Sequence, residues 1–241
     1  MNQFYVIMSN MERLIVLDTE TTGIDPKEGH RIIEVGAVEI LNREITGTEF
    51  QKYIQPNRNV GESVNIHGIT DKKLINKPQF SQICEELLSF IEGATLVIHN
   101  APFDLGFLNN ELKIIGIKKT IEDLCPVIDT LELSKEKRPG RMHGMDALSR
   151  SFDINTVDRF TVDELKNKNR HHGALSDARI LAEIYLKLTG GQSILFNKEE
   201  NTKPQMSDPS LVKKNIENKD NIKVIYANSE EVKIHKNYFN K

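Results

Sequence analysis

The sequence predicts an α/β domain followed by a polar C-terminal segment. Short apolar runs typical of buried strands recur along the chain, and stretches with the 3.6-residue spacing of amphipathic helices lie between and after them. After Phe196 the composition changes, and the chain becomes rich in Lys, Asn, Glu and Ser. A length of 241 residues suits one α/β domain with an appendage, or two small domains.

The strands are expected in five apolar segments. They are residues 14–17, 32–40, 50–54, 95–98 and 127–130. Asn42 and Arg43 stand between the second and the third segment and are typical of a hairpin turn. Consecutive strands on such short turns favour antiparallel pairing.

Helical spacing of apolar residues predicts the helices. The segments are 80–91, 103–115, 131–133, 146–152 and a long last helix that opens around His171 and is stopped by Gly190 and Gly191. Thr70 or Asp71 can cap a further short helix. Residues 135–141 are basic and contain Pro and Gly, so a loop is expected there.

Bulk composition limits the functions that the chain can have. The net charge of −3 at pH 7 argues against a broad basic surface that coats nucleic acid, but it allows a small cleft for a few nucleotides. Cys84 and Cys125 lack metal-type spacing and are expected to be buried thiols in a reducing compartment. No apolar run reaches the roughly 18–20 residues that span a bilayer, and residues 1–10 do not resemble a secretion signal. A cytoplasmic protein without a membrane partner is therefore expected.

Two acids end the first predicted strand. Side chains two residues apart on a strand point the same way, with Cα atoms about 6–7 Å apart, so Asp18 and Glu20 share one face. Two carboxylates beside a buried strand are costly unless a positive charge lies between them. A divalent cation with hard oxygen ligands is the natural partner.

Two further acids stand at comparable places. Asp104 lies in the first turn of a helix that follows a strand, and Asp177 lies early in the last long helix. If both helices flank the first strand, four carboxylates meet, and they cannot all stay ionised without cations. Two Mg²⁺ or Mn²⁺ ions would balance this charge and neutralise a scissile phosphate.

His172 is the candidate general base. Five residues at about 100° each would place His172 and Asp177 roughly 140° apart on one continuous helix. Both can face one centre only if His172 lies at the helix entrance, where Gly173 allows a turn. Its ordinary pKa, about 6.5, suits the removal of a proton from the attacking water.

Each of these residues also has an ordinary structural explanation. A lone Asp-x-Glu is usually surface charge, an acid in a first helical turn suits the helix dipole, and a lone His is usually solvated. The combination of acids at element boundaries beside apolar runs favours a site. Other polar residues near the strands do not complete the ligand set and are interpreted as structural: Asp25, Glu34, Glu39, Asp129 and His171.

Three stretches resemble the motifs of a known family. Residues 17–23 (LDTETTG), 97–104 (VIHNAPFD) and 172–178 (HGALSDA) resemble the three exonuclease motifs of the DEDDh 3′–5′ exonucleases. More closely, residues 11–196 resemble the epsilon proofreading subunits of bacterial DNA polymerase III, with support from residues 33–39, 67–69 and 180–192. The resemblance implies a ribonuclease H-like fold with a mixed five-stranded sheet flanked by helices.

The resemblance also implies an activity and a site. It implies hydrolysis of the terminal phosphodiester at a DNA 3′ end, with release of a nucleoside 5′-monophosphate. The implied metal ligands are Asp18, Glu20, Asp104 and Asp177, and the implied base is His172. The implied contacts to the terminal nucleotide are Asp18, Glu20, His67, His99, Asn100, Phe103 and Asp177.

The C-terminal segment carries two candidate interaction peptides. Gln192 to Phe196 resembles peptides that bind the sliding clamp, and residues 224–232 resemble the tail by which epsilon subunits dock the polymerase alpha subunit, although this tail is shorter than in some members. A small theta-like subunit is a further candidate partner. The expected division is an exonuclease domain at 1–191, a flexible linker at 192–221 and a docking segment at 222–241.

Two other functions compete with proofreading. A stand-alone RNA exonuclease of the ribonuclease T or oligoribonuclease type would share every catalytic residue, but it has little need for residues 192–241. A catalytically idle adaptor would depend on the tethering segments alone, and the intact set of acids argues against it.

Overall fold

The computed structural model describes residues 12–156 and 173–190. The strands are β1 (Arg13–Thr21), β2 (Ile32–Leu41), β3 (Glu44–Tyr53), β4 (Thr95–Ile98) and β5 (Val127–Asp129). The helices are α1 (Val64–His67), α2 (Asp71–Leu74), α3 (Phe80–Ile91), α4 (Ala101–Ile114), α5 (Thr130–Lys137), α6 (Met145–Ser151) and α8 (Ala174–Thr189). Two short 3₁₀ helices are η1 (Pro26–Glu28) and η2 (Gly61–Ser63).

The five strands form one mixed sheet with the order β3-β2-β1-β4-β5. β1 is central: it pairs antiparallel with β2 and parallel with β4. The hairpin turn expected between β2 and β3 is present, and Asn42 and Arg43 both have positive φ, as a tight hairpin requires. The predicted mixed five-stranded α/β fold is confirmed.

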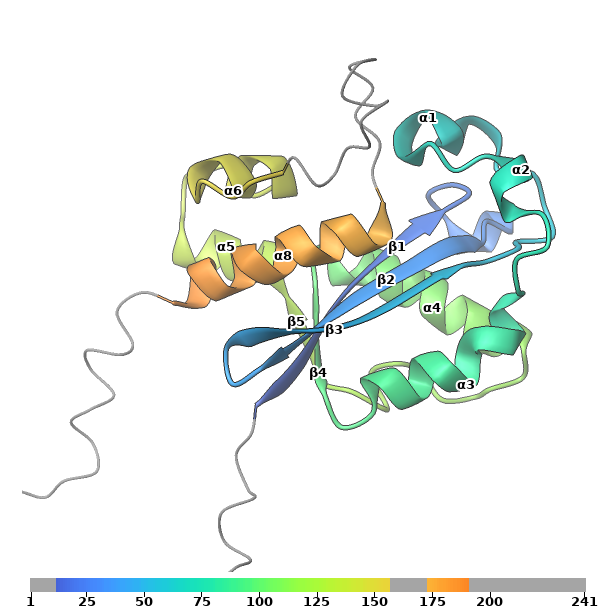
Figure 1. The fold of residues 1–241 in the computed structure, drawn as a ribbon, viewed down its shortest axis with the longest axis horizontal. Coiled ribbons are helices and arrows are strands. Elements are labelled where there is room, and N and C mark those ends of the chain that lie inside the picture. Colours follow the sequence, from blue (N-terminus) through green and yellow to red (C-terminus); the bar gives the residue numbers. More distant parts are fainter. Residues whose placement is uncertain (1–11, 157–172, 191–241) are drawn as a thin grey trace, which may run out of the picture. The chain divides into compact units, whose positions relative to one another are not determined.

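Helices cover both faces of the sheet (Figure 1). Ile15 and Leu17 of β1 belong to the core shared with α3 and α4, whereas Leu14 and Val16 belong to the core shared with α8. This alternation follows from the period of two along a strand. Side chains of β1 with even numbers therefore face α8, and those with odd numbers face α3 and α4.

Two predicted elements, the third strand and the helix after the fifth strand, have other bounds in the structure. β3 begins at Glu44 rather than at residue 50, because its first six residues are exposed on an edge strand and carry no apolar pattern. Residues 135–137 are the last residues of α5 rather than part of a loop. The helix ends before Pro139, since a proline disfavours helical geometry in the residue that precedes it.

The structure also bears on the expectations about membrane-spanning helices and about the two cysteines. Among residues 12–156 and 173–190, no helix is long and apolar enough to cross a membrane. Cys84 and Cys125 are free thiols buried in the core beside α3, as expected. The expected segments at 192–221 and 222–241 lie outside the described residues.

Candidate active site

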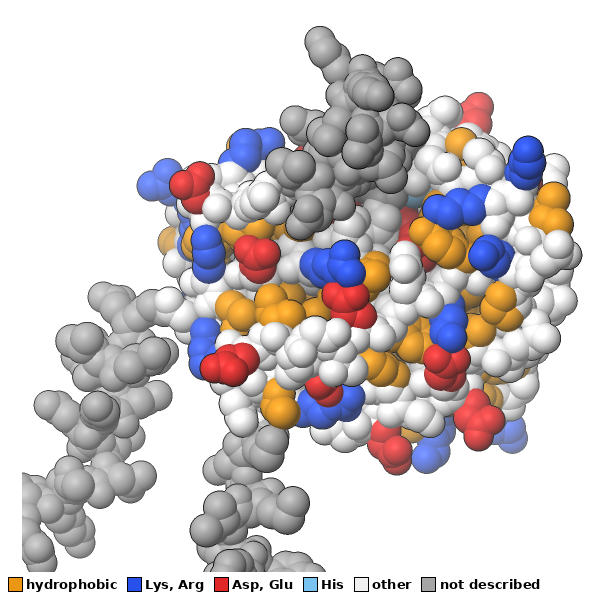
Figure 2. Space-filling model, viewed as in Figure 1, with side chains coloured by type: hydrophobic (Ala, Val, Ile, Leu, Met, Phe, Trp, Pro, Cys, Tyr) orange, Lys and Arg blue, Asp and Glu red, His pale blue; other side chains and the backbone are white. Residues whose placement is uncertain are grey.

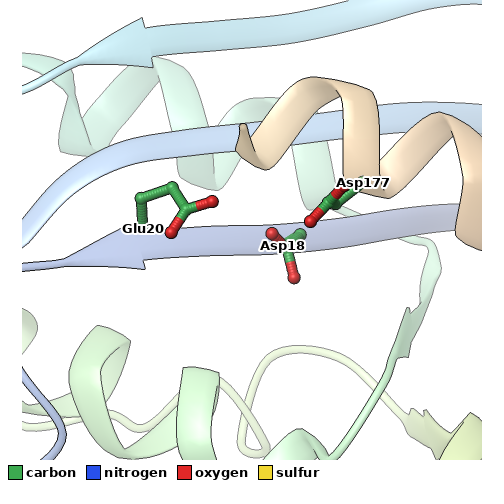
Figure 3. A group of neighbouring side chains, drawn as sticks. All are labelled: Asp18, Glu20 and Asp177. Carbon is green, nitrogen blue, oxygen red and sulfur yellow. The ribbon is translucent and has the colours of Figure 1, made fainter. Parts of the chain in front are cut away.

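β1 presents its two acids to α8. Because Leu14 and Val16 pack against α8, the alternation along the strand brings Asp18 and Glu20 to the same face. Asp18 is half-buried and Glu20 is buried. In Figure 3 both side chains lie beside the first turns of α8. The predicted shared face of the two carboxylates is therefore present.

Asp177 completes a group of three carboxylates. It lies in the first turn of α8, is buried, and points back toward Asp18 (Figure 3). One oxygen atom from each of Asp18, Glu20 and Asp177 lies within 4.8 Å of the other two. Acids that are 157 residues or more apart along the chain are thus brought together by the packing of α8 on β1.

Gly36 of β2 permits this close approach of α8. A Cβ atom at Gly36 would lie 2.1 Å from the backbone nitrogen of Leu175 and 2.3 Å from the carbonyl carbon of Ala174. Gly36 pairs in register with Asp18, so this close contact between β2 and α8 lies beside the carboxylate cluster. The absence of a side chain at Gly36 sets the height of α8 above the sheet.

Asp104 approaches β1 by a different route. It lies in the first turn of α4 and is buried, and its Oδ1 accepts a 2.6 Å hydrogen bond from the hydroxyl of Thr19. Thr19 stands between Asp18 and Glu20 in the sequence, but it belongs to the odd-numbered row of β1, which faces α4. The hydrogen bond therefore holds Asp104 against β1 from the α4 side. It is not one of the three residues whose oxygens meet within 4.8 Å.

Burial and mutual repulsion shift the pKa values of these acids. The pKa of Asp18 is raised well above its usual value by burial and by the neighbouring charges of Asp104, Asp177 and Glu20. Burial also raises the pKa of Asp104 to about 7, against the opposing effect of the hydrogen bond from Thr19. Converging carboxylates of this kind supply the hard oxygen ligands that divalent cations prefer, so the residues fit a divalent-cation site.

His172 lies outside the described residues, but the residue after it is described. Gly173 is the N-cap of α8 and has φ −150° and ψ 128°. The described part of α8 therefore begins directly after Gly173, and the place of His172 at the helix entrance stays a prediction. A Cβ atom at Gly173 would lie 3.3 Å from the hydroxyl of Ser176, which would have to shift by a few tenths of an ångström.

Four other predicted substrate residues lie at the end of α1 and at the beginning of α4. His67 is buried, and its Nδ1 accepts a 3.0 Å hydrogen bond from the backbone N–H of Ile69. Asn100 is exposed and is the N-cap of α4 with φ 64°. Phe103 is half-buried, with its ring 5.1 Å from that of Phe107. Their contact with a nucleotide stays a prediction.

The His99 ring is oriented by a chain of hydrogen bonds. The hydroxyl of Thr130 donates to the carbonyl of Ile98 at 3.1 Å, so at 2.9 Å it accepts from Nδ1 of His99. This assignment leaves Nε2 of a neutral His99 as an acceptor. Burial lowers the pKa of His99, which favours the neutral ring.

Two acids that the sequence interpretation left as structural lie beside the site. Glu34 pairs in register with Glu20 and is buried, and Asp129 ends β5 next to the entrance of α4. Each accepts hydrogen bonds from the first backbone N–H groups of a site helix. A buried acid within the run Ile-Ile-Glu-Val was the available signal, because such a residue requires a partner.

Comparison with known proteins defines the class of this fold and site. A family model described as "Exonuclease" matches residues 15–185. DNA polymerase III subunit epsilon of Pasteurella multocida is 40% identical over 231 residues, which cover 94% of this chain and 87% of the relative. The same subunit of Escherichia coli is 40% identical over 92% of this chain and 90% of the relative. The chain belongs to the exonuclease family, in the group formed with the DNA polymerase III epsilon subunits.

Solved structures show the same fold. Exonuclease X in complex with 5′ overhanging duplex DNA is 24% identical, with a TM-score of 0.55 over 73% of this chain and 90% of that chain. The zinc-bound form of the Escherichia coli exonuclease I complex with single-stranded DNA is 16% identical, with a TM-score of 0.60 over 78% of this chain and 42% of that chain. The predicted exonuclease fold and family are confirmed.

Proposed function

We propose that this chain is the proofreading 3′–5′ exonuclease subunit of a bacterial DNA polymerase III. It removes mismatched 3′-terminal nucleotides of DNA as 5′-monophosphates. The observation that carries the proposal is the convergence of carboxylate oxygens from Asp18, Glu20 and Asp177 within 4.8 Å, in a chain about 40% identical to epsilon subunits over nine tenths of its length.

The acids and His172 have separate roles in this proposal. Asp18, Glu20, Asp104 and Asp177 hold two divalent cations, Mg²⁺ or Mn²⁺. Such cations supply charge neutralisation at the scissile phosphate and lower the pKa of a water nucleophile. His172 removes the proton of the attacking water, and its place next to the N-cap of α8 puts it close in sequence to the cluster.

Selectivity for mismatches follows from the unpairing of the primer end. His67, His99, Asn100 and Phe103 hold the terminal nucleotide, by stacking on Phe103 and by hydrogen bonds such as one accepted at Nε2 of His99. A nucleotide must leave the duplex to reach them, and a mismatched end costs less of the few kcal/mol of unstacking than a paired one. The site therefore discriminates without reading sequence.

The proposed partners bind outside the described residues. Gln192–Phe196 binds the sliding clamp through the apolar side chains of Leu195 and Phe196, and residues 222–241 dock the polymerase alpha subunit. A theta-like subunit is a further candidate. The epsilon names of the relatives, which match this chain nearly end to end, favour this function over a stand-alone RNA exonuclease.

A 3′-end degradation assay tests the proposal. Purified protein is incubated with a 3′-mismatched primer–template, the matched duplex, single-stranded DNA and RNA of the same sequence, each with Mg²⁺ or Mn²⁺. We expect cation-dependent release of 5′-monophosphates, faster from the mismatched than from the matched end. Faster degradation of RNA than of either frayed or single-stranded DNA would support the RNA exonuclease, and no release at high protein concentration would support the idle adaptor.

A further inference from the structure

The two helices that carry site acids begin without caps of their own. The N-cap of α4 is Asn100 and that of α8 is Gly173, and neither makes a side-chain hydrogen bond to its helix. The first backbone N–H groups of a helix have no partner within the helix and need one from elsewhere. In both helices, an acid from a neighbouring strand provides it.

Glu34 of β2 caps α8. Its Oε2 accepts a 3.2 Å hydrogen bond from the backbone N–H of Ala174, the first residue of the helix. Its Oε1 accepts a 2.6 Å hydrogen bond from Nε2 of Gln51 on β3. Glu34 is only 1% exposed and pairs in register with Glu20, so both of its oxygens are fixed beside the cluster.

Asp129 of β5 caps α4. Its Oδ1 and Oδ2 accept 3.1 Å hydrogen bonds from the backbone N–H groups of Asn100 and Ala101. Its Oδ1 also accepts a 2.8 Å hydrogen bond from Leu131 in its own helix α5, which fixes the carboxylate from a second side. β5 pairs with β4, and β4 leads into α4, so the cap joins neighbouring segments of the same sheet edge.

The two caps occupy equivalent positions relative to the site. Ala174 precedes Asp177 by three residues, and Ala101 precedes Asp104 by three residues. Residues three apart lie on the same side of a helix, one turn along it. A shift of either helix entrance would therefore displace the site acid by a similar amount, and a misplacement of about 1 Å can cost about 10²-fold in rate.

We propose that Glu34 and Asp129 are positioning residues that fix the entrances of α8 and α4 and thereby set Asp177 and Asp104 against Asp18. This inference deepens the proposed function and rests on it. A negative charge at a helix N-terminus also interacts favourably with the helix dipole, so both carboxylates stabilise the arrangement that they set. The hydrogen bonds, more than the charges, carry the positioning.

Paired variants test the inference in the full chain. Glu34→Ala and Asp129→Ala remove the acceptors, whereas Glu34→Gln and Asp129→Asn keep an oxygen that can accept the helix N–H. We expect each alanine variant to lower kcat and to weaken Mn²⁺ binding, measured by electron paramagnetic resonance, by about 10- to 100-fold, with little change in KM. Each amide variant keeps one accepting oxygen in place of two and is expected to restore part of both quantities.

Two acids away from the site are matched controls. Glu39 lies on the same strand as Glu34 and bonds Arg13 and Thr46, and Asp123 accepts the backbone N–H of Thr120 in the loop before β5. Glu39→Ala and Asp123→Ala are expected to keep wild-type kcat and Mn²⁺ affinity. If Glu34→Ala does not fold, Glu34→Asp retains the charge with a shorter reach and is expected to show the same direction of loss.

The outcomes separate the inference from the function on which it rests. Alanine variants with wild-type kcat and Mn²⁺ affinity would overturn the positioning role, and so would amide variants as impaired as the alanine variants, because the effect would then follow charge. If the wild-type protein releases no nucleotide, the proposed function fails, while the Mn²⁺ titration still tests whether Glu34 and Asp129 hold the cluster together.

Discussion

Asp18 is the residue on which most of the site's negative charge converges. Asp104, Asp177, Glu20 and Glu34 all act on it, and together with burial they raise its pKa. Without cations, the folded protein must hold these charges together or protonate some of them. A single residue thus links the stability of the metal-free protein to its capacity to bind cations.

Asp18→Asn is therefore expected to have opposite effects on activity and stability. It removes a proposed cation ligand worth several kcal/mol of transition-state stabilisation, so the rate should fall by roughly 10³-fold. It also relieves repulsion, so the melting temperature of the metal-free protein should not fall. Rates and melting curves with and without Mg²⁺ check both effects, and exposed Glu132→Gln is the control that should change neither. A marked loss of melting temperature without metal would contradict this account.

Asp104 gives the metal-free protein a pH-dependent stability. Its pKa is about 7 in the folded chain, against about 4 for an ordinary Asp in an unfolded chain. Below about pH 4 both states are protonated, and above about pH 7 both are ionised, so the cost of burying the charge develops between these values. The stability contributed at this residue is therefore expected to fall as the pH rises through this window.

Asp104→Asn isolates this effect because the amide retains an oxygen that can accept from Thr19. The melting temperature of the variant minus that of the wild type, both metal-free, is expected to increase from pH 5 to pH 8. Mg²⁺ added at pH 8 should raise the melting temperature of the wild type more than that of the variant. A difference that stays constant over this pH range would show that Asp104 keeps an ordinary pKa.

At the scale of elements, the contact between β2 and α8 determines the geometry of the cluster. Gly36→Ala would place a Cβ atom about 2 Å from the backbone of the first turn of α8. The helix must move, so we expect a destabilisation of about 1–3 kcal/mol together with weaker Mn²⁺ binding. Urea unfolding and Mn²⁺ titration measure the two effects.

Gly144→Ala is the matched control for Gly36→Ala. A Cβ atom at Gly144 meets nothing within 4 Å, and its φ of −64° suits any residue. This variant is expected to unfold at the same urea concentration as the wild type and to bind Mn²⁺ equally well. Equal behaviour of Gly36→Ala and Gly144→Ala would show that the approach of α8 to β2 does not set the site.

The sequence predicts those elements whose own residues carry the signal. Apolar runs and the spacing of apolar residues locate β1, β2, α3 and α8, because the residues that form the buried face of each element recur at regular intervals along the sequence. The start of β3 escapes prediction because it depends on pairing with β2. The end of α5 is missed by only a few residues, because Pro139 ends the helix at Lys137 rather than at the start of the basic segment. Local pattern gives no information on partners that lie elsewhere in the chain.

In the candidate site, too, some features follow from the sequence alone and others depend on contacts with distant parts of the chain. The shared face of Asp18 and Glu20 follows from strand alternation alone, so the sequence was sufficient for it. The bond between Thr19 and Asp104 and the capping by Glu34 and Asp129 join segments 28 to 140 residues apart, and no spacing rule reports them. Because such contacts cannot be seen in the sequence, Glu34 and Asp129 are interpreted there as structural residues only.

At the scale of the whole molecule, the charge that can be seen on one face bears on how DNA reaches the site. Figure 2 shows Lys and Arg side chains interspersed with Asp and Glu over the face that it draws. With a net charge of −3, long-range attraction of DNA to this face is expected to be weak. Delivery of the primer end would then depend on the partners proposed for the C-terminal segment, which would hold the exonuclease beside the polymerase.

Deletion of residues 211–241 tests this division of labour. The site acids and the cores that position them lie within residues 12–190, so the truncated protein should release nucleotides from free oligonucleotides at the wild-type rate. It should no longer co-purify with the polymerase alpha subunit, whereas Leu195→Ala combined with Phe196→Ala should keep that partner and lose the sliding clamp. Because the two segments act separately in this account, a truncated protein that still co-purifies with the polymerase would place docking elsewhere, and a truncated protein without activity would mean that the tail supports the active site itself.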